Sequence, residues 1–345
     1  MKRELTERQK LLLTLIVHEH TRTTQPVGSK SLVKQYGLNI SSATIRNELA
    51  IMTELGYLHQ PHTSAGRVLT EEGYRFFVSN LVQQTNLPIN TRNTISHQFY
   101  QSPQGLDQWL RLAASILANQ SQAASIVTAP HTENATFKHL ELLSTRATQV
   151  LMVLVLVGGE IRQRILSLDE TVSQESLSQI ADRLNDLCQG CNVEQIEKLV
   201  FEPSPVLHQV IDAVLEDMRL SAKLVTGEVY LDGLTNVLAE PEFAQSQLAR
   251  SPMRLLEERT LLNDVLSRTV MTEKVGGVQV LIGGEGTWAE LRDCSVILTR
   301  YGIPDQLTGT LGVLGPMRMP YGHTISTVRF IAGLLSDLVS ENMLE

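Results

Sequence analysis

The sequence has few cysteines and no long apolar run. Three cysteines among 345 residues are too few for a disulfide scaffold and are typical of a reducing compartment. The longest apolar run, residues 150–157, is far shorter than the ~20 residues that a membrane helix requires. The apolar stretch at residues 11–17 is flanked by charges and precedes no small-residue cleavage site, so we expect no signal peptide. These absences predict a soluble cytoplasmic protein.

Groups for catalysis or metal binding are also scarce. The sequence shows no set of nucleophile, base and orienting residue, so we expect no enzyme activity, no cofactor and no metal. Cys188 and Cys191 have redox-motif spacing, but no strand precedes them and no second Cys/His pair lies nearby for a zinc site. Four histidines near the N-terminus leave a metal sensor open as an alternative: His18, His20, His59 and His62. On a helix, His18 and His20 point roughly 200° away from each other, which argues against that alternative.

Charge is distributed unevenly along the chain. The formal net charge is −8, which argues against a protein that coats nucleic acid along its whole surface. The first 75 residues nevertheless hold ten Lys and Arg against seven Asp and Glu, whereas the remainder holds nineteen against thirty. A small basic part on a large acidic body indicates that the N-terminal end binds nucleic acid.

The first 82 residues show the pattern of three helices followed by a hairpin. Apolar spacing predicts helices over residues 6–21, 29–37 and 43–55, with Thr6 and Ser29 as caps. Short strands at 57–60 and 67–69 flank a polar turn, and Thr70 caps a further helix over 71–81. This is the plan of a winged helix-turn-helix.

The rest of the chain mixes strands and helices. Residues 83–104 are polar and interrupted by prolines, which predicts a linker. Beyond them, strand-like runs occur early and late around a mostly helical middle, and residues 231–238 are expected to be helical. We therefore expect an α+β multidomain protein in which one domain is inserted into another.

The third helix gives the sharpest physical argument for DNA binding. At 100° per residue, Ile45, Leu49 and Met52 share one face and must point into the core. The opposite face carries Asn47, which can pair with adenine, and its shoulder carries Arg46, which can pair with guanine or phosphate. This pattern predicts a helix that contacts a DNA groove.

The segments around that helix add groups that suit phosphate. The turn at residues 61–67 holds basic and small polar side chains and no acid, so it can straddle a phosphate backbone or enter the minor groove. Hydroxyl and N–H groups at helix starts also bind phosphate oxygens. The predicted DNA contacts are Ser29, Lys30, Ser41, Ser42, Thr44, Arg46, Asn47, His62, Ser64 and Arg67. One winged helix-turn-helix contacts only a few base pairs, so we expect two copies of the chain to bind two half-sites.

Motifs spread along the chain resemble one bacterial family. They are Pro-Val-Gly-Ser-Lys at 26–30, Ser-Ser-Ala-Thr-Ile-Arg-Asn-Glu at 41–48, Gln-Pro-His-Thr-Ser-Ala-Gly-Arg at 60–67, Tyr-Leu-Asp-Gly-Leu at 230–234, Pro-Glu-Phe at 241–243 and Leu-Gly-Val-Leu-Gly-Pro-Met-Arg-Met at 311–319. In this order they resemble the HrcA family, the bacterial heat-inducible transcription repressors. The last motif predicts a sharp turn with Arg318 making buried hydrogen bonds. Before Thr70 the chain has leucine where the family pattern has proline.

The resemblance implies both an architecture and a function. It implies a winged-helix DNA-binding domain at 1–82, a linker at 83–104, a GAF-like domain at 105–145 and 226–345, and an inserted dimerisation domain at 146–225. It further implies a homodimer that binds the CIRCE inverted repeat of double-stranded DNA and represses chaperone operons. The GroEL chaperonin would keep this repressor active.

Two other functions stay open on the residues alone. In one, a pocket in the GAF-like domain binds a small-molecule effector and the DNA-binding head responds. In the other, the chain is a GAF-type enzyme or a scaffold with an incidental head.

Overall fold

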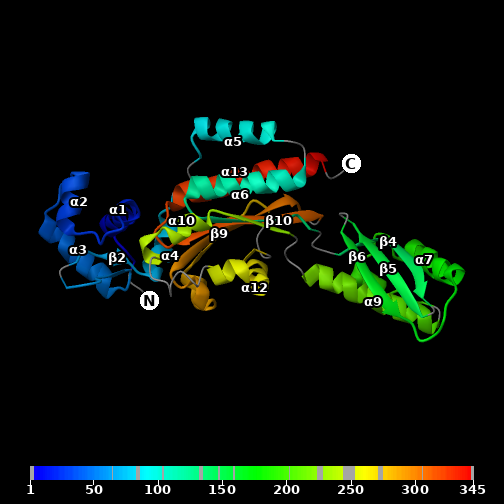
Figure 1. Cartoon of the computed structure of the whole chain (residues 1–345). Coiled ribbons are helices and arrows are strands. Elements are labelled where there is room, and N and C mark those ends of the chain that lie inside the picture. The colour runs from blue at the N-terminus through cyan, green and yellow to red at the C-terminus, as the bar shows by residue number, and fades with distance from the viewer. Residues whose placement is uncertain are drawn as a thin grey trace. The chain divides into compact units, whose positions relative to one another are not determined.

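The structure, a computed structural model, combines helices with β-sheets (Figure 1). It describes residues 4–63, 65–82, 86–102, 105–131, 135–146, 148–157, 160–201, 203–223, 228–243, 253–270, 275–304 and 306–342. The chain divides into two compact units. The first unit comprises Met1–Val127, Val229–Arg300 and Thr310–Leu335, and the second comprises Thr128–Glu228, Tyr301–Gly309 and Ser336–Glu345. Among the described residues, we find no helix with the length and hydrophobicity that a membrane crossing demands.

The first unit begins with three helices close to their predicted bounds. Thr6 caps α1 (Glu7–Thr23): its hydroxyl accepts from the Gln9 amide, and the Gln9 side chain accepts from the Thr6 amide. Next come α2 (Ser29–Tyr36) and α3 (Ser42–Glu54). One predicted cap is wrong. Gly28, whose backbone is extended, precedes the first turn of α2, and Ser29 is already a helical residue.

A short hairpin and a fourth helix follow. β1 (Leu58–His59) pairs antiparallel with β2 (Val68–Leu69). The strands are shorter than predicted because the neighbouring backbone bonds elsewhere: the carbonyl of Tyr57 accepts from the Thr70 amide, and Arg67 pairs with Val27. α4 (Glu71–Asn80) begins where predicted, with the Thr70 hydroxyl accepting from the Gly73 amide at 3.1 Å.

The rotation of α3 about its axis is fixed by apolar packing and by one buried carboxylate. Ile45, Leu49 and Met52 are buried, as their spacing predicted. Glu48 is buried on the same side, where the Arg8 guanidinium donates to one carboxylate oxygen and the Gln9 side-chain amide donates to the other at 2.9 Å. Because a buried charge is tolerated only when it is paired and hydrogen-bonded, this cluster ties α3 to the start of α1.

The polar segment that we expected to be a linker contains a regular helix. α5 spans Ile89–Gln101 and follows Pro88. Ile95 and Phe99, one helical turn apart, are buried, and the Arg92 guanidinium lies 5.2 Å from the centroid of the Phe330 ring. The polar composition concealed this apolar pair, which gives the helix one face to bury. A proline is tolerated at a helix start, so Pro88 does not interrupt it.

A five-stranded sheet has the strand order β7-β3-β10-β9-β8. Its strands are β3 (Ala124–Thr128), β7 (Val229–Asp232), β8 (Val278–Ile282), β9 (Cys294–Ile303) and β10 (Leu307–Pro316). In Figure 1, α6 (Leu106–Ser121) and α13 (Tyr321–Asn342) lie over one face of this sheet and α12 (Arg259–Val270) lies over the other. Coverage on both faces explains why β10 is buried along its whole length.

The segment at 231–238 differs from its prediction. Instead of one helix it contains the end of β7 and the short helix α10 (Leu234–Leu238). Gly233 separates the two with a left-handed backbone (φ 71°), and a Cβ there would collide with the carbonyl of Ala123. A single helix cannot pass through that conformation.

The second unit has its own sheet and core. β4 (Phe137–Arg146), β5 (Gln149–Leu156) and β6 (Ile161–Ser167) form an antiparallel sheet in that order. The apolar core of this unit includes residues of α7 (Gln174–Cys188), α8 (Val193–Ile196) and α9 (Pro205–Lys223). Alternate residues of β5, such as Met152 and Leu154, point into this core.

The Glu48 cluster generates a prediction about the stability of α3. We expect Glu48→Ala to reduce the local stability of α3 by about 1–3 kcal/mol, because it leaves the buried Gln9 amide without its acceptor. Amide hydrogen exchange of the α3 segment, followed by mass spectrometry, should then be faster by about five- to 150-fold. Glu54→Ala, at the exposed end of the same helix, is the matched control and should change little. Equal exchange rates in both variants would contradict a role for Glu48 as an anchor.

Candidate nucleic-acid interface

The outward side of α3 is the first component of the candidate site. Burial of Ile45, Glu48 and Leu49 leaves Arg46 and Asn47 exposed on the same helix. The helix begins after an exposed serine cap, since the Ser41 hydroxyl accepts from the Thr44 amide at 3.1 Å. The positive end of the helix dipole therefore lies next to the residues that were predicted to contact DNA.

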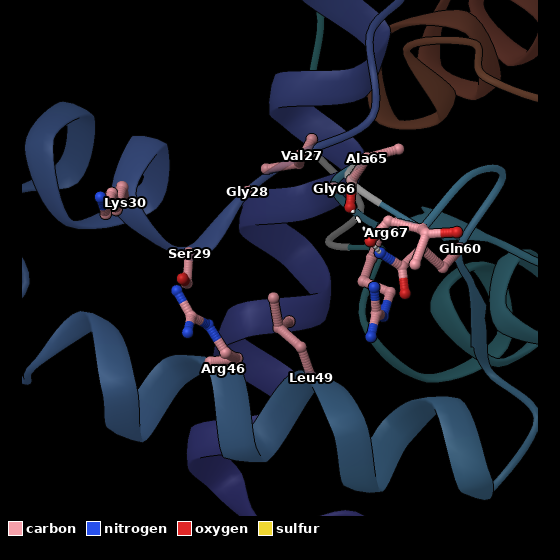
Figure 2. A pocket seen from close by; sticks show the side chains of 11 residues that line it. Val27, Gly28, Ser29, Lys30, Arg46, Leu49, Gln60, Ala65, Gly66 and Arg67 are labelled. Atoms are coloured by element: carbon pink, nitrogen blue, oxygen red, sulfur yellow. Dashed lines mark hydrogen bonds between the residues drawn. The ribbon is translucent and has the colours of Figure 1, made fainter.

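A hollow of about 450 Å³ opens beside this helix (Figure 2). It is lined by Val27, Gly28, Ser29, Lys30, Arg46, Leu49, Gln60, Thr63, Ala65, Gly66 and Arg67. In Figure 2, Arg46 extends from α3 toward Ser29, and Arg67 points from the hairpin toward α3. Three cations thus line the hollow, and none of the described lining residues is acidic. A concave cationic surface of this kind attracts polyanions such as nucleic acid.

The start of α2 contributes backbone donors to the same hollow. Gly28, Ser29 and Lys30 line it, and within the described part of the chain no side chain caps this helix. The first N–H groups of a helix have no partner in the helix itself. At the edge of a cationic hollow, they are suited to hydrogen-bond a phosphate oxygen.

The hairpin is held in place by hydrogen bonds around its turn. The Gln60 side-chain amide donates to the carbonyls of Thr63 and Ala65, at 2.8 and 2.9 Å. The base of the hairpin is joined to Val27, since the Val27 amide donates to the Arg67 carbonyl at 2.9 Å and the Arg67 amide donates back at 2.8 Å. Gly66 permits this approach, because a Cβ there would collide with the Val27 backbone.

Arg67 is the cation with the most defined position. Its Nε donates to the hydroxyl of Thr53 near the end of α3, at 3.1 Å. The Thr53 hydroxyl in turn donates to the Leu49 carbonyl at 2.8 Å. Arg67 is therefore connected to the hairpin through its backbone and to α3 through its side chain.

The structure places the described contact residues that were predicted at three positions: the hollow, the outward side of α3 and the hairpin turn. Ser29, Lys30, Arg46 and Arg67 line the hollow, and Ser29 is buried there whereas Lys30 is exposed. Ser41, Ser42, Thr44 and Asn47 belong to the start and outward side of α3, and His62 is exposed in the hairpin turn. Ser64 lies outside the described residues.

Three positioning residues were missed by the sequence argument. Glu48, Thr53 and Gln60 fix α3, Arg67 and the hairpin turn, respectively. The nearest signal was the i, i+3 and i, i+4 spacing that places Glu48 on the same face as Ile45 and Met52. The partners of Glu48 lie about 40 residues away in the sequence and Arg67 lies 14 residues from Thr53, so local patterns do not identify them, whereas the partners of Gln60 are local.

Two alternatives to a nucleic-acid interface were a redox site at Cys188 and Cys191 and a metal site. Burial raises the pKa of Cys188 to about 11, whereas a redox-active cysteine needs a lowered pKa. Within the described ranges, no cluster of three or more His, Cys, Asp or Glu residues is arranged to hold a metal ion.

Comparison with known proteins finds relatives that match nearly the whole chain. A family model described as the HrcA protein C terminal domain matches residues 107–325. A protein of Roseiflexus castenholzii named heat-inducible transcription repressor HrcA is 44% identical, and the match covers 99% of this chain and 96% of that protein. A protein of the same name from Herpetosiphon aurantiacus is 41% identical, with 98% and 96% covered.

A solved structure shares the fold. The crystal structure of a hypothetical protein has a TM-score of 0.58 and 22% sequence identity to this chain, and the match covers 98% of both chains. The name shared by the relatives describes a transcription repressor and not an enzyme. The extent and identity of these matches show that the chain belongs to the HrcA family of heat-inducible transcription repressors.

Proposed function

We propose that this protein is a dimeric, cytoplasmic repressor that binds an inverted-repeat operator through its N-terminal 82 residues, which act as a winged helix-turn-helix. The observation that carries the proposal is the cationic hollow beside the exposed side of α3. Beyond this domain we propose a GAF-like domain interrupted by a dimerisation domain. Because β4 (Phe137–Arg146) pairs with β5 in the sheet of the second unit, we propose that the inserted domain begins before β4 and not at residue 146. No catalytic step and no cofactor form part of the proposal.

In this proposal, some side chains contact DNA bases and others contact the phosphate backbone. Asn47 and Arg46 are exposed on α3 and suit base edges, where Asn pairs with adenine and Arg with guanine. Lys30 and Arg67 line the hollow and suit the phosphate backbone, together with the first amides of α2. His62 in the hairpin turn would contact the backbone or the minor groove. Base contacts give sequence preference, and phosphate contacts give most of the affinity and its salt dependence.

The proposed dimer has a candidate surface in the second unit. One face of its three-stranded sheet packs on the core, and the other presents apolar side chains. Ile161 and Ile165 of β6 are 59% and 62% exposed, and Leu143 of β4 is 46% exposed. Ile165 pairs with Leu151 on β5, which pairs in turn with Leu143, so the three form a row across this face. A continuous apolar row of this kind is typical of a protein interface.

The operator and the chaperonin enter the proposal from the family resemblance. We propose that the operator is the CIRCE inverted repeat and that the GroEL chaperonin keeps the repressor in its binding-competent state. A gel-shift titration of the full chain tests both. The CIRCE duplex should shift at lower protein concentration than a scrambled duplex, and added chaperonin should increase the active fraction. If both duplexes shift equally, the proposed operator is wrong; if the chaperonin leaves the active fraction unchanged, its proposed role is wrong.

The division between base and phosphate contacts predicts different phenotypes. We expect Asn47→Ala to weaken operator binding by about 1–3 kcal/mol and to relax the preference at one base position, with little effect on scrambled DNA. We expect Lys30→Ala to weaken binding to both duplexes and to reduce the salt slope by about 1 per head. Fluorescence anisotropy over a range of salt concentrations measures both quantities.

Lys34→Ala is the control for these measurements, because Lys34 is exposed on α2 but does not line the hollow. Its binding curves should match those of the unchanged protein. Equal losses on both duplexes from Asn47→Ala and Lys30→Ala would contradict the division between the two contact types.

The apolar sheet face predicts how the dimer can be broken. Ile165→Lys places a charge in the middle of the row and should weaken self-association by about 2 kcal/mol per protomer or more. Sedimentation equilibrium of the full chain measures this. Leu187→Lys replaces a similarly exposed apolar residue on α7 and should leave the dimer intact. A dimer that persists in Ile165→Lys would place the interface elsewhere.

A further inference from the structure

A second hollow, of about 430 Å³, lies within the first unit and shares a wall with the cationic hollow. Pro26 lines the second hollow, and the next residue, Val27, lines the cationic hollow. Likewise, Pro61 lines the second hollow and its neighbour Gln60 lines the cationic hollow. In a third pair of neighbours, Val68 lines the second hollow and Arg67 lines the cationic hollow. Since successive residues of an extended backbone point to opposite sides, one thin layer separates the two hollows. The Val27–Arg67 hydrogen bonds hold that layer together.

The second hollow has the size and the walls of a small-molecule site. Ligand pockets in proteins usually measure about 300–1,000 Å³ and are mostly apolar, with a few polar groups. Here Pro26, Pro61, Val68, Leu69 and Met317 supply apolar surface. The segments at 241–242, 293 and 317–318 face residues of α1, the hairpin and α4 across it.

Among the described residues that line this hollow, the cationic side chain is Arg318, which is paired with two carboxylates. The buried Arg318 guanidinium donates to both oxygens of Glu242, one of them at 2.9 Å, and also to Glu240. Two carboxylates on one guanidinium leave a net negative charge. The Glu242 side chain keeps 32% of its surface exposed, and carboxylate oxygens can accept more than one hydrogen bond. Asp293 adds a second negative charge to the lining.

The two histidines of the lining do not offset this charge. Burial lowers the pKa of His20, and the Nδ1 atom of its ring lies 3.0 Å from the Tyr74 hydroxyl. Burial also lowers the pKa of His59. Both rings are therefore neutral near pH 7. Among the described residues that line the hollow, acidic groups outnumber cations, so an anionic ligand would be repelled.

We propose that this hollow binds a small organic cation with an apolar body. The ammonium group would lie near Glu242 and Asp293, and the apolar part would pack against the prolines and Met317. Such a ligand would contact the hairpin on one side and the 317–318 segment on the other. It would therefore stabilise the arrangement of the hairpin in which Gln60 and Arg67 line the cationic hollow, and so strengthen operator binding. This last step rests on the proposed function, whereas the binding of the cation does not.

Isothermal titration calorimetry of the full chain tests the site without DNA. The probes are phenethylammonium, neutral 2-phenylethanol and the anion phenylacetate, which are similar in size. We expect saturable binding of about one phenethylammonium per chain at up to millimolar concentration, and at least ~10-fold weaker binding of phenylacetate. If phenethylammonium shows no saturable binding, or if phenylacetate binds equally well, the proposed site is refuted.

Variants locate the charge that is responsible. Asp293→Asn should weaken phenethylammonium binding at least ~3-fold and leave 2-phenylethanol binding unchanged, because one negative charge is lost and the shape is kept. Glu242→Gln should act in the same direction, but it also removes a partner of Arg318, so Asp293→Asn is the decisive variant. Asp186→Asn, an exposed substitution on α7, is the control. Unchanged affinity in Asp293→Asn would place the cation elsewhere.

Operator titrations with and without saturating phenethylammonium test the coupling. We expect at least ~3-fold tighter operator binding in its presence and a smaller gain in Asp293→Asn. If the amine binds but operator affinity stays constant, the coupling is wrong and the site stands. If the protein binds no inverted repeat at all, the proposed function and the coupling fail together, and calorimetry still decides whether the site exists.

Discussion

The buried carboxylate of Glu48 is the interaction on which the orientation of α3, and so the candidate DNA interface, depends. Apolar packing alone turns one face of α3 toward the core. The charged Glu48 on that face must also reach its two hydrogen-bond donors on α1, Arg8 and Gln9. Rotation of α3 by even one residue would remove Glu48 from these donors and bury Asn47 or Arg46 instead. Apolar packing and the partners of Glu48 together fix the inward side of α3 and leave its outward side exposed.

The hairpin, like α3, is held in position by side-chain and backbone contacts with other elements. It contains only two residues in each strand, too few to hold its shape alone. Its geometry comes from contacts outside the strands: the Val27 backbone, the Gln60 side chain and the Thr53 hydroxyl. Because the last of these belongs to α3, the position of the Arg67 guanidinium follows from the position of that helix.

The sequence was most informative where a structure is determined locally. Thr6 and Thr70 cap helices as predicted, because a hydroxyl at a helix start needs only a backbone amide two or three residues later. The linker prediction missed α5 because only two of its side chains, Ile95 and Phe99, are buried and its composition is polar. Arg318 was expected to make buried hydrogen bonds; its guanidinium is buried and hydrogen-bonded, but its partners Glu240 and Glu242 are partly exposed, and Glu242 lies 76 residues away. No local pattern identifies a partner at that distance.

In the candidate site, too, local sequence patterns predicted the helix face but not the contacts between residues distant in sequence. The outward face of α3 followed from 3.6-residue periodicity, and the family motifs marked all three segments that line the hollow. The direction of each side chain depended on tertiary contacts, so Ser29, predicted as a contact, is buried, while Arg67 is turned toward Thr53. Membership of the HrcA family accounts for the motifs, and the structure brings residues of three of them together around one hollow.

Site-specific photocross-linking tests most directly whether α3 lies against DNA. A photoreactive amino acid would replace Ala43, which is exposed at the start of this helix, and a control protein would carry it at the exposed Asp182 of α7. If α3 reads the operator, irradiation of the complex should cross-link position 43 to both halves of the inverted repeat and position 182 to neither. An operator complex that forms at full affinity but never cross-links through position 43 would contradict the account.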